Sequence, residues 1–462
     1  KRGNNSGMTE NMKYDFNDLT VKLGGSNMPL CNFCGTCIGI CPTGALTSDY
    51  ERGKPVFDES KCIKCGLCYR HCQGIGVDFA ALDSSFKGGE NYDKYFKSYN
   101  KCYLAHSSND PVRMKGSSGG SVTTLLVYML EKKLVDGVII PRPKPDQQWL
   151  FRPEIVTDVK TVKSSAQSKY CLIPTNEILN SLKDKKGKYA IVALPCQIHS
   201  IRKLQNEGNK NAKKLEYLLA LICGHDMEYG ATMFGMNKLK IRKEDVVDIK
   251  YRDHGDWPGG LSFYLKNGEK KGINFFNYHY LNAVYLPNRC RLCPDYYGNY
   301  SDISFGDSWL ERLLGRGMNE KGIPKGWSSI IAKTDKGLAL LKAAEKGKAI
   351  HLEEIGTDEI HESFPFNISY KLNGIFIRLK FARKKPEYIG LEKPEKLDRY
   401  IYHFIYNIIL VMGGSKAFRF ILMLLPLNFN LFLIKNFKKL MGYKPNARDK
   451  VLKYNEKSNV DK

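Results

Sequence analysis

The chain has 462 residues, 42% hydrophobic and 26% charged, which excludes a disordered or collagen-like protein and leaves room for about three domains. Lysine and arginine total 72 against 48 acidic residues, a formal charge of +24, so the partner is expected to be anionic: nucleic acid, an acidic membrane surface or a polyanionic small molecule. Fourteen cysteines are too many for an ordinary cytosolic enzyme, and the chain is too long for a disulfide-stapled miniprotein. A metal or cluster protein in a reducing compartment is indicated.

Residues 1–25 are expected to be disordered, and no apolar segment typical of a signal peptide follows them. We therefore expect a cytoplasmic protein. No zinc finger, RNA-binding aromatic signature or basic helix is apparent, so we expect no nucleic-acid partner.

Two cysteine runs dominate residues 26–85, which we expect to form a small domain. Each run has the spacing C-x2-C-x2-C-x3-C, the first ending in Cys-Pro: Cys31, Cys34, Cys37 and Cys41, then Cys62, Cys65, Cys68 and Cys72. In this spacing three thiolates wrap one 4Fe-4S cube and the fourth reaches the other cube. One cluster should therefore take Cys31, Cys34, Cys37 and Cys72, and the other Cys62, Cys65, Cys68 and Cys41. Gly44, Asp49, Gly53 and Pro55 suit a short β-hairpin between the runs.

A pair of zinc sites is the alternative, but zinc favours separated CxxC knuckles. Over about residues 27–80 the chain resembles bacterial two-cluster ferredoxins. It departs from them at Gln73, which stands where a proline usually follows the last cysteine. This changes a turn and not a ligand.

The middle of the chain alternates apolar runs with helical patterns, which predicts a largely parallel α/β sheet. Strands are expected at 134–140, 188–194 and 215–222, and helices at 121–133 and 197–205. Cys196 and Cys223 follow two of these strands, so they should lie at the same sheet edge. With Cys290 and Cys293 they would hold a third 4Fe-4S cluster; alternatively, two of the four are merely buried. Cys102 and Cys171 are expected to be structural.

Two further segments are candidates for binding a cofactor. The run from Lys115 to Leu126 places Ser118, Gly119, Gly120 and Thr123 at the start of a helix, where free N–H groups suit a phosphate; the alternative is a plain helix cap. In the run from Ser164 to Tyr170, Lys169 suits a flavin phosphate and Tyr170 suits stacking, or the run is a solvated loop.

Together these motifs resemble the beta-subunit family of coenzyme F420 hydrogenases and dehydrogenases. The resemblance covers about residues 100–310, and the ferredoxin module resembles the fused arrangement in the electron-input subunit of the F420H2 dehydrogenase. The motifs are Ser118-Gly119-Gly120-x2-Thr123, Ser168-Lys169-Tyr170, Pro195-Cys196-Gln197, Cys223-Gly224, Tyr251-Arg252-Asp253, Cys290-x2-Cys293-x-Asp295 and Asp302-Ile303-Ser304-x-Gly306-Asp307-x-Trp309.

The resemblance implies FAD, hydride exchange with the deazaflavin F420 or a similar carrier, and the third cluster on Cys196, Cys223, Cys290 and Cys293. It also implies that Ser118, Gly119, Gly120, Thr123, Ser168, Lys169 and Tyr170 contact the flavin. Ala193-Leu194 stands where the family has Gly-Thr. This departure keeps open the alternative of a non-catalytic ferredoxin-type electron-transfer subunit, of the kind found near polysaccharide genes. No catalytic residue is assigned; Asp307, His225 and His254 are candidates for proton handling, with a structural role favoured.

The fold class expected is therefore α+β and α/β: a ferredoxin-like two-cluster domain (26–85), an α/β flavin domain (95–375) and a basic helical tail (376–462). From Phe381 to Lys462 there are 17 basic and 7 acidic residues. Apolar runs at 404–412 and 420–434 are too short to span a bilayer. They fit either a helix lying on the inner, anionic membrane surface or a helical pair packed on protein. A redox partner protein is expected as well.

Overall fold

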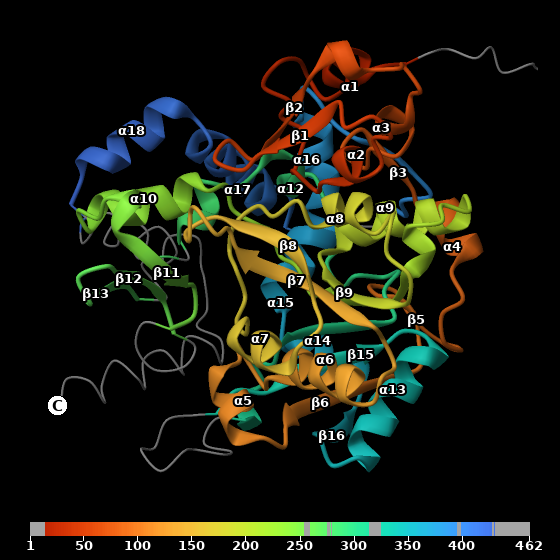
Figure 1. Cartoon of the computed structure of the whole chain (residues 1–462). Helices are drawn as coiled ribbons and strands as arrows, with labels where there is room; N and C mark the ends of the chain where they lie inside the picture. Colours follow the sequence, from red (N-terminus) through yellow and green to blue (C-terminus); the bar gives the residue numbers. More distant parts are fainter. Residues whose placement is uncertain are drawn as a thin grey trace, which may run out of the picture.

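The protein is built around one eight-stranded sheet (Figure 1). The structure, a computed structural model, describes residues 14–253, 259–274, 278, 280–313, 325–394, 399–426 and 429. The strand order is β16 (Ile350–Ile355), β6 (Lys101–Ser107), β15 (Ser328–Ala332), β14 (Ile303–Asp307), β10 (Leu215–Leu221), β9 (Tyr189–Ala193), β7 (Gly137–Pro143) and β8 (Phe151–Val156). The neighbours β14, β10, β9 and β7 run parallel, and every other pairing in the sheet is antiparallel. The sheet is therefore mixed, and not largely parallel as expected.

The strand and helix predictions for the middle of the chain hold with shifted ends. β9 and β10 lie where they were predicted, and α9 (Pro195–Asn206) begins with proline in its first turn, where a missing N–H costs nothing. α6 (Ser121–Glu131) ends early, and β7 starts only at Gly137, because Lys133 turns the chain with a φ of +54°. The carboxyl ends of β9, β10 and β14 meet at one edge of the sheet, as parallel strands require.

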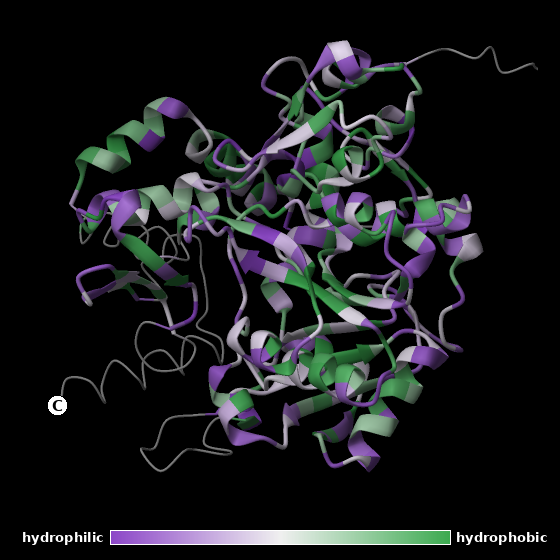
Figure 2. Ribbon diagram, in the orientation of Figure 1, coloured by the Kyte–Doolittle hydropathy of each residue, from purple (hydrophilic) through white to green (hydrophobic). Residues whose placement is uncertain are grey.

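Helices cover both faces of the sheet. One face packs against α6, α7 (Val159–Ser164) and α13 (Asp335–Lys346), and the other packs against α4 (Phe79–Ser85), α8 (Ile178–Ser181) and α9. The strands between them are largely green in Figure 2 because both of their faces are buried. Cys102 lies 2% exposed in β6 and Cys171 1% exposed in a neighbouring apolar cluster, which agrees with a structural role for both.

The cysteine-rich module lies at the top of the molecule in Figure 1, above α8 and α9. It contains α1 (Phe16–Lys22), α2 (Thr36–Gly39), the antiparallel hairpin of β1 (Leu46–Asp49) and β2 (Lys54–Phe57), α3 (Leu67–Arg70) and β3 (Gly76–Asp78). The predicted hairpin is therefore confirmed. The expected disorder over 1–25 does not hold for α1, because Asp15 caps it and Phe16 and Leu19 bury their side chains in the module's core.

A C-terminal strand completes this module. β17 (Glu387–Ile389) pairs in parallel with β3, so a segment more than 300 positions away in sequence closes the edge of the ferredoxin-like part. The proposed boundary at 376 also falls inside α16 (Ile375–Phe381), which is buried, and its Arg378 donates to the Arg291 carbonyl (2.7 Å). The chain after 375 is thus partly integral to the fold and not only an appended tail.

The remaining elements surround the sheet. They are the hairpin β4 (Asn91–Asp93) and β5 (Lys97–Tyr99), the antiparallel sheet of β11 (Val246–Lys250), β12 (Leu261–Leu265) and β13 (Lys270–Ile273), and the helices α5 (Asp110–Lys115), α10 (Gly230–Lys238), α12 (Asn288–Arg291), α14 (Thr357–Glu362), α15 (Pro365–Asn367), α17 (Tyr400–Gly413) and α18 (Lys416–Leu424). Within the described ranges no single helix is long and apolar enough to cross a membrane; α17 and α18, bent by 74°, reach that length and composition only as a pair.

The docking of α2 depends on a glycine that no other residue can replace. Gly35 has a φ of +85°, and a Cβ there would lie 2.4 Å from the Pro174 carbonyl oxygen. We expect Gly35→Ala to lower the free energy of unfolding in urea by about 3 kcal/mol, because the left-handed strain adds to this clash.

Gly44 is the matched control, since it also has a positive φ (+68°) but its Cβ would meet nothing within 4 Å among the described residues. Gly44→Ala should cost about 1 kcal/mol. Equal losses for the two variants would contradict this account of α2.

Candidate functional site

The two cysteine runs adopt the same local conformation. In the first run Phe33 has a φ of +55°, and in the second run Lys64 has a φ of +54°. The backbone N–H of each donates to the sulfur of the first cysteine of its run, Cys31 or Cys62, at 3.4 Å. A glycine in the left-handed region then begins a short helix in each run. The sequence repeat is therefore a structural repeat, with backbone donors aimed at sulfur.

The thiols gather into two sets that exchange their fourth members. Burial raises the pKa of Cys37, and charge repulsion from Cys34, Cys31, Cys72 and Cys68 raises it further. Burial likewise raises the pKa of Cys68 to about 12, with further contributions from Cys65, Cys62 and Cys41. Cys72 thus lies near the first run and Cys41 near the second, and the assignment of the two ligand sets stays a prediction. We call these the first set (Cys31, Cys34, Cys37, Cys72) and the second set (Cys62, Cys65, Cys68, Cys41).

A third set of thiols lies at the carboxyl edge of the sheet. Cys196 starts α9, Cys223 follows β10, and Cys290 and Cys293 come from α12 and the turn after it. All four line one cavity. Burial raises the pKa of Cys196 well above its ordinary value, and repulsion from the other three thiols adds to the shift. The two strand-end cysteines thus lie at one edge, as predicted.

Two buried cations accompany the third set. Lys371 and Arg289 are each 1% exposed and line the same cavity. Burial alone would lower the pKa of Lys371, but Cys293, Cys223 and Cys290 hold it above its ordinary value. Such cations offset negative charge on the thiolates. Neither was predicted from the sequence, because both come from positions outside the cysteine motifs.

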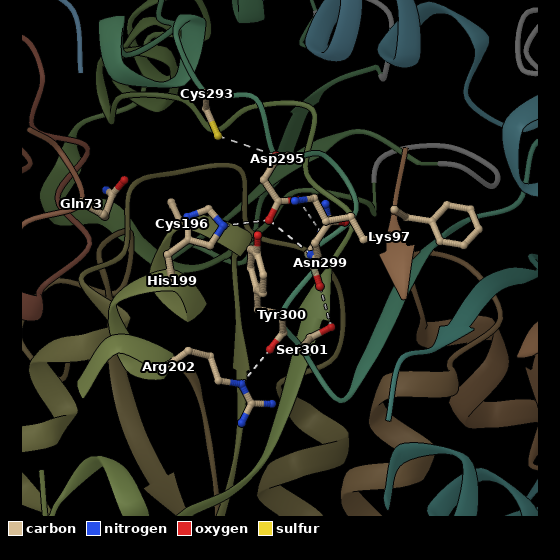
Figure 3. A network of polar contacts seen from close by, with 12 residues as sticks. Gln73, Lys97, Cys196, His199, Arg202, Cys293, Asp295, Asn299, Tyr300 and Ser301 are labelled. Carbon is tan, nitrogen blue, oxygen red and sulfur yellow. Dashed lines mark hydrogen bonds and ion pairs between the residues drawn. The ribbon is translucent and has the colours of Figure 1, made fainter. Parts of the chain in front are cut away.

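A polar network behind the third set joins α9 to the turn after Cys293 (Figure 3). His199, one turn after Cys196, pairs through Nε2 with Asp295 Oδ2 at 2.8 Å, and both side chains are 2% exposed. Asp295 also accepts from the Gly298 and Asn299 N–H groups. Burial alone would raise the pKa of Asp295, but the hydrogen bond and charge of His199 hold it below its ordinary value. This pair fixes the distance between the segments that carry Cys196 and Cys293.

The glycine turn lies at the same sheet edge, against the end of β6. A Cβ on Gly119 would lie 2.4 Å from the Ala105 carbonyl oxygen, and the Gly119 N–H donates to Ser328 Oγ (3.1 Å), which also pairs with Ser118 Oγ. Gly120 begins α6 with a φ of +73°, and no side chain in the described part of the chain caps the helix. The buried Ser121 Oγ likewise has no hydrogen-bond partner among these residues. The start of α6 therefore presents unused donors, with Thr123 in its first turn.

The second candidate segment meets the glycine turn. The Ser168 N–H donates to Ser117 Oγ (2.7 Å). Arg252, 6% exposed, donates to the Ser117 carbonyl (2.7 Å), to Tyr170 Oη (2.8 Å) and to Asp307 Oδ2 (3.0 Å). Arg252 thus connects three segments that lie far apart in the sequence. Arg252 belongs to a motif of the family resemblance, but the sequence did not predict that it connects these segments.

Lys169 is oriented toward its own loop. Its Nζ donates to the carbonyls of Ser165, Ala166 and Gln167 at 2.5–3.0 Å. Burial lowers its pKa to about 8. In this arrangement the lysine closes the loop, and a phosphate would have to replace those carbonyls.

The candidates for proton handling fall in different places. His225 lines the third-set cavity, Asp307 pairs with Arg252, and His254 lies outside the described residues. Asp226 was not predicted from the sequence; its backbone N–H donates to Cys290. Burial raises the pKa of Asp226 to about 7, against the effect of the Met227 backbone N–H, which lowers it.

The buried pair of His199 and Asp295 gives a test of the site's scaffold. We expect Asp295→Ala to lower the free energy of unfolding in urea by about 3 kcal/mol, because an imidazole and two backbone N–H groups lose their buried partner. Glu354→Ala removes the exposed pair with Lys101 and serves as the control, for which little change is expected. A loss in Asp295→Ala no larger than that of the control would show that the pair does not hold the site together.

Three family profiles match parts of this chain. The family profile for the N-terminal part of the coenzyme F420 hydrogenase/dehydrogenase beta subunit matches residues 102–180, and the profile for its C-terminal part matches residues 186–358. A 4Fe-4S dicluster domain profile matches residues 30–74. Together the first two cover more than half of the chain.

Individual relatives carry related descriptions. The coenzyme F420-dependent sulfite reductase of Methanocaldococcus jannaschii is 29% identical over 340 residues, which are 71% of this chain and 48% of that protein. A subunit of the F420H2 dehydrogenase of Methanosarcina mazei is 26% identical over 331 residues, 67% of this chain and 80% of that protein. A chain of the F420-reducing [NiFe] hydrogenase complex of Methanosarcina barkeri aligns over 66% of this chain and all of its own length, at 21% identity and a TM-score of 0.49.

This chain spans about half of the sulfite reductase and about four fifths of the dehydrogenase subunit. The third thiol set and the glycine turn share one sheet edge, and two family profiles cover more than half of the chain. The chain therefore belongs to the coenzyme F420 hydrogenase/dehydrogenase beta-subunit family, with a 4Fe-4S dicluster domain preceding the family core.

Proposed function

We propose that the protein is an iron–sulfur flavoprotein oxidoreductase that moves electrons between a hydride carrier, reduced coenzyme F420 or a similar compound, and a partner protein. The observation that carries the proposal is the third thiol set. It lies beside the first set and at the same edge of the sheet as the glycine turn, where it would connect a hydride-handling site to single-electron carriers. The descriptions of the relatives support F420 as the carrier.

Each thiol set fits a 4Fe-4S cube. The first set would hold one cluster, the second set another and the third set (Cys196, Cys223, Cys290, Cys293) the last. Burial and neighbouring sulfurs raise the pKa of at least one thiol in each set, so these sulfurs would bind as thiolates only beside strong positive charge, which ferric and ferrous ions would supply. Bound clusters would carry electrons one at a time.

FAD fits the start of α6. The uncapped helix N-terminus and the unpartnered Ser121 Oγ suit a phosphate, and the buried Arg252 adds a positive charge nearby. We assign Ser118, Gly119, Gly120, Thr123, Ser168, Lys169 and Tyr170 as flavin contacts. When bound, a flavin exchanges a hydride on one side and single electrons on the other. The protein's part is to bind and orient the flavin and to hold its environment positive.

The thiol sets stand in an order that supports a route for electrons. Cys34 of the first set is close enough to raise the pKa of Cys196 in the third set, whereas the second set lies toward solvent, with Cys65 exposed and Ile63 64% exposed. Electrons would therefore pass between the sheet edge and the partner through the first set and then the second. The reverse direction uses the same order.

Cofactor content is the first test. Protein purified without oxygen should contain about 12 iron atoms per chain and show a flavin absorbance band. We expect the double variant Cys223→Ser/Cys290→Ser to retain about 8, because only the third set is lost, and Cys102→Ala to retain all of them. A colourless, iron-free preparation would contradict the proposal.

The hydride carrier is tested on the same material. Reduced F420 should bleach the flavin band of the intact protein under anaerobic conditions, and Arg252→Met should weaken flavin retention without removing iron, because Arg252 lies at the proposed flavin site. If reduced nicotinamides bleach the band and reduced F420 does not, the carrier assignment is wrong.

Two observations favour a second candidate, a non-catalytic electron-transfer subunit. Lys169 Nζ is occupied by three carbonyls of its own loop, and Ala193-Leu194 departs from the family pattern. Clusters without bound flavin in the preparation described above would support this alternative.

We also propose that the tail rests on an anionic membrane. The buried face of α17 makes polar contacts beside the buried Leu410: Asn407 accepts from Arg291, and His403 pairs with Ser369 (3.2 Å). Its outer face is apolar, and so is much of α18, which is largely green in Figure 2. The exposed apolar residues, here called the tail surface, are Ile401, Ile405, Ile408, Val411, Met412, Phe420, Ile421 and Leu424. An apolar outer face in a basic segment suits the interface of an acidic bilayer.

Vesicle sedimentation tests this contact. The protein should sediment with phosphatidylglycerol-containing vesicles and less with phosphatidylcholine alone, and Ile401→Asp/Ile405→Asp should abolish sedimentation. Val247→Asp changes an apolar residue that is 43% exposed elsewhere and should have no effect. If the wild type sediments with neither vesicle, the tail surface has another occupant, such as a partner subunit.

A further inference from the structure

The repeat in the dicluster module is broken at two positions. Asn32 follows the first cysteine of its run where the second run has Ile63, and Gln73 follows the last cysteine of its run where the first run has Pro42. The backbone conformations of the two runs are the same. Ile63 is 64% exposed, whereas Asn32 and Gln73 are 8% and 3% exposed. The two polar residues are therefore buried, and we expect their hydrogen-bond partners to include residues outside the ferredoxin-like module.

Both residues face the third set and contact each other. Asn32 lines the cavity of the first set and that of the third set, and its Nδ2 donates to Cys196 Sγ (3.0 Å). Gln73 Nε2 donates to Asn32 Oδ1. Arg289 Nη2 in turn donates to Gln73 Oε1 (2.9 Å) and to the Gln73 carbonyl (2.9 Å). A continuous chain of hydrogen bonds runs from Arg289 through two amides to a cysteine of the third set.

Arg289 determines the direction of donation along this series of hydrogen bonds. A guanidinium has only donors, so it must meet the oxygen of the Gln73 amide. The Gln73 nitrogen then faces the Asn32 oxygen, and the Asn32 nitrogen is left to face sulfur. Arg289 thus orients both amides so that a positive dipole end lies against Cys196.

We propose that Asn32, Gln73 and Arg289 are positioning residues that raise the reduction potential of the cluster held by the third set and tie that cluster to the one held by the first set. The proposal rests on the third cluster of the proposed function. Hydrogen bonds to cluster sulfurs and nearby positive charge stabilise the more negative, reduced state. Asn32 follows Cys31 and Gln73 follows Cys72, so the same two residues fix the first set against the third.

The variant that tests this is Asn32→Ile, because isoleucine already occupies the equivalent position in the second run. We expect it to lower the midpoint potential of the third cluster, measured by redox titration followed by electron paramagnetic resonance. A tenfold change in the one-electron equilibrium, about 59 mV, is the expected size. The signal of the third cluster is identified by its absence from Cys223→Ser/Cys290→Ser.

Gln73→Glu is a second variant in case Asn32→Ile loses iron. The glutamate keeps the contact with Arg289 but cannot donate to Asn32, so the Asn32 nitrogen turns toward the carboxylate and the same potential falls. Ile63→Asn is the matched control, since it adds an amide at an exposed position of the other run, and it should leave the third cluster's potential unchanged.

The outcomes separate the two proposals. If the wild type holds about 12 iron atoms and Asn32→Ile and Gln73→Glu leave the third cluster's potential where it was, the inference is overturned and the proposed function stands. If the wild type holds only about 8, the third cluster itself is absent and both fall. An equal shift in Ile63→Asn would show that the effect does not come from the hydrogen bond to Cys196.

Discussion

The structure depends on cysteines that are crowded into three sets. In each set burial raises the pKa of at least one thiol and neighbouring sulfurs raise it further, so sulfurs that ionise there need positive charge beside them. The protein supplies part of that charge itself. Lys371 and Arg289 are buried at the third set, where the surrounding sulfurs hold the pKa of Lys371 above its ordinary value. Iron would supply the remainder.

The sheet determines where this chemistry takes place. Because β9, β10 and β14 are parallel, their carboxyl ends present Cys196, Cys223 and Asp307 along one edge. The antiparallel strands β6 and β15 bring the glycine turn to the same edge, through Ala105 and Ser328. Behind it, the His199 and Asp295 pair sets the spacing of the cysteine segments (Figure 3). The proposed flavin site and the third thiol set therefore lie at the same edge of the sheet.

The parts of this site that could be predicted from sequence are those that depend on residues close together in the chain. Doubled cysteine runs predict the exchange of Cys41 and Cys72, which stays a prediction, and apolar strands followed by Cys196 and Cys223 predict a shared edge, which the sheet has. Arg252, Arg289, Lys371 and Asp226 could not be predicted, because their importance comes from burial beside residues distant in sequence. The mixed sheet was missed for a related reason: strands such as β15 and β16 follow long connections that leave their direction open. Gln73 was noticed only as a changed turn, since its partner Arg289 is 216 positions away.

The pairing of β3 with β17 has a consequence for how the chain is made. Residues 76–78 emerge from the ribosome early, but the strand that completes their edge, Glu387–Ile389, emerges only after most of the polypeptide has been synthesised. Through most of translation the edge of β3 in the ferredoxin-like module therefore has no β17 to pair with.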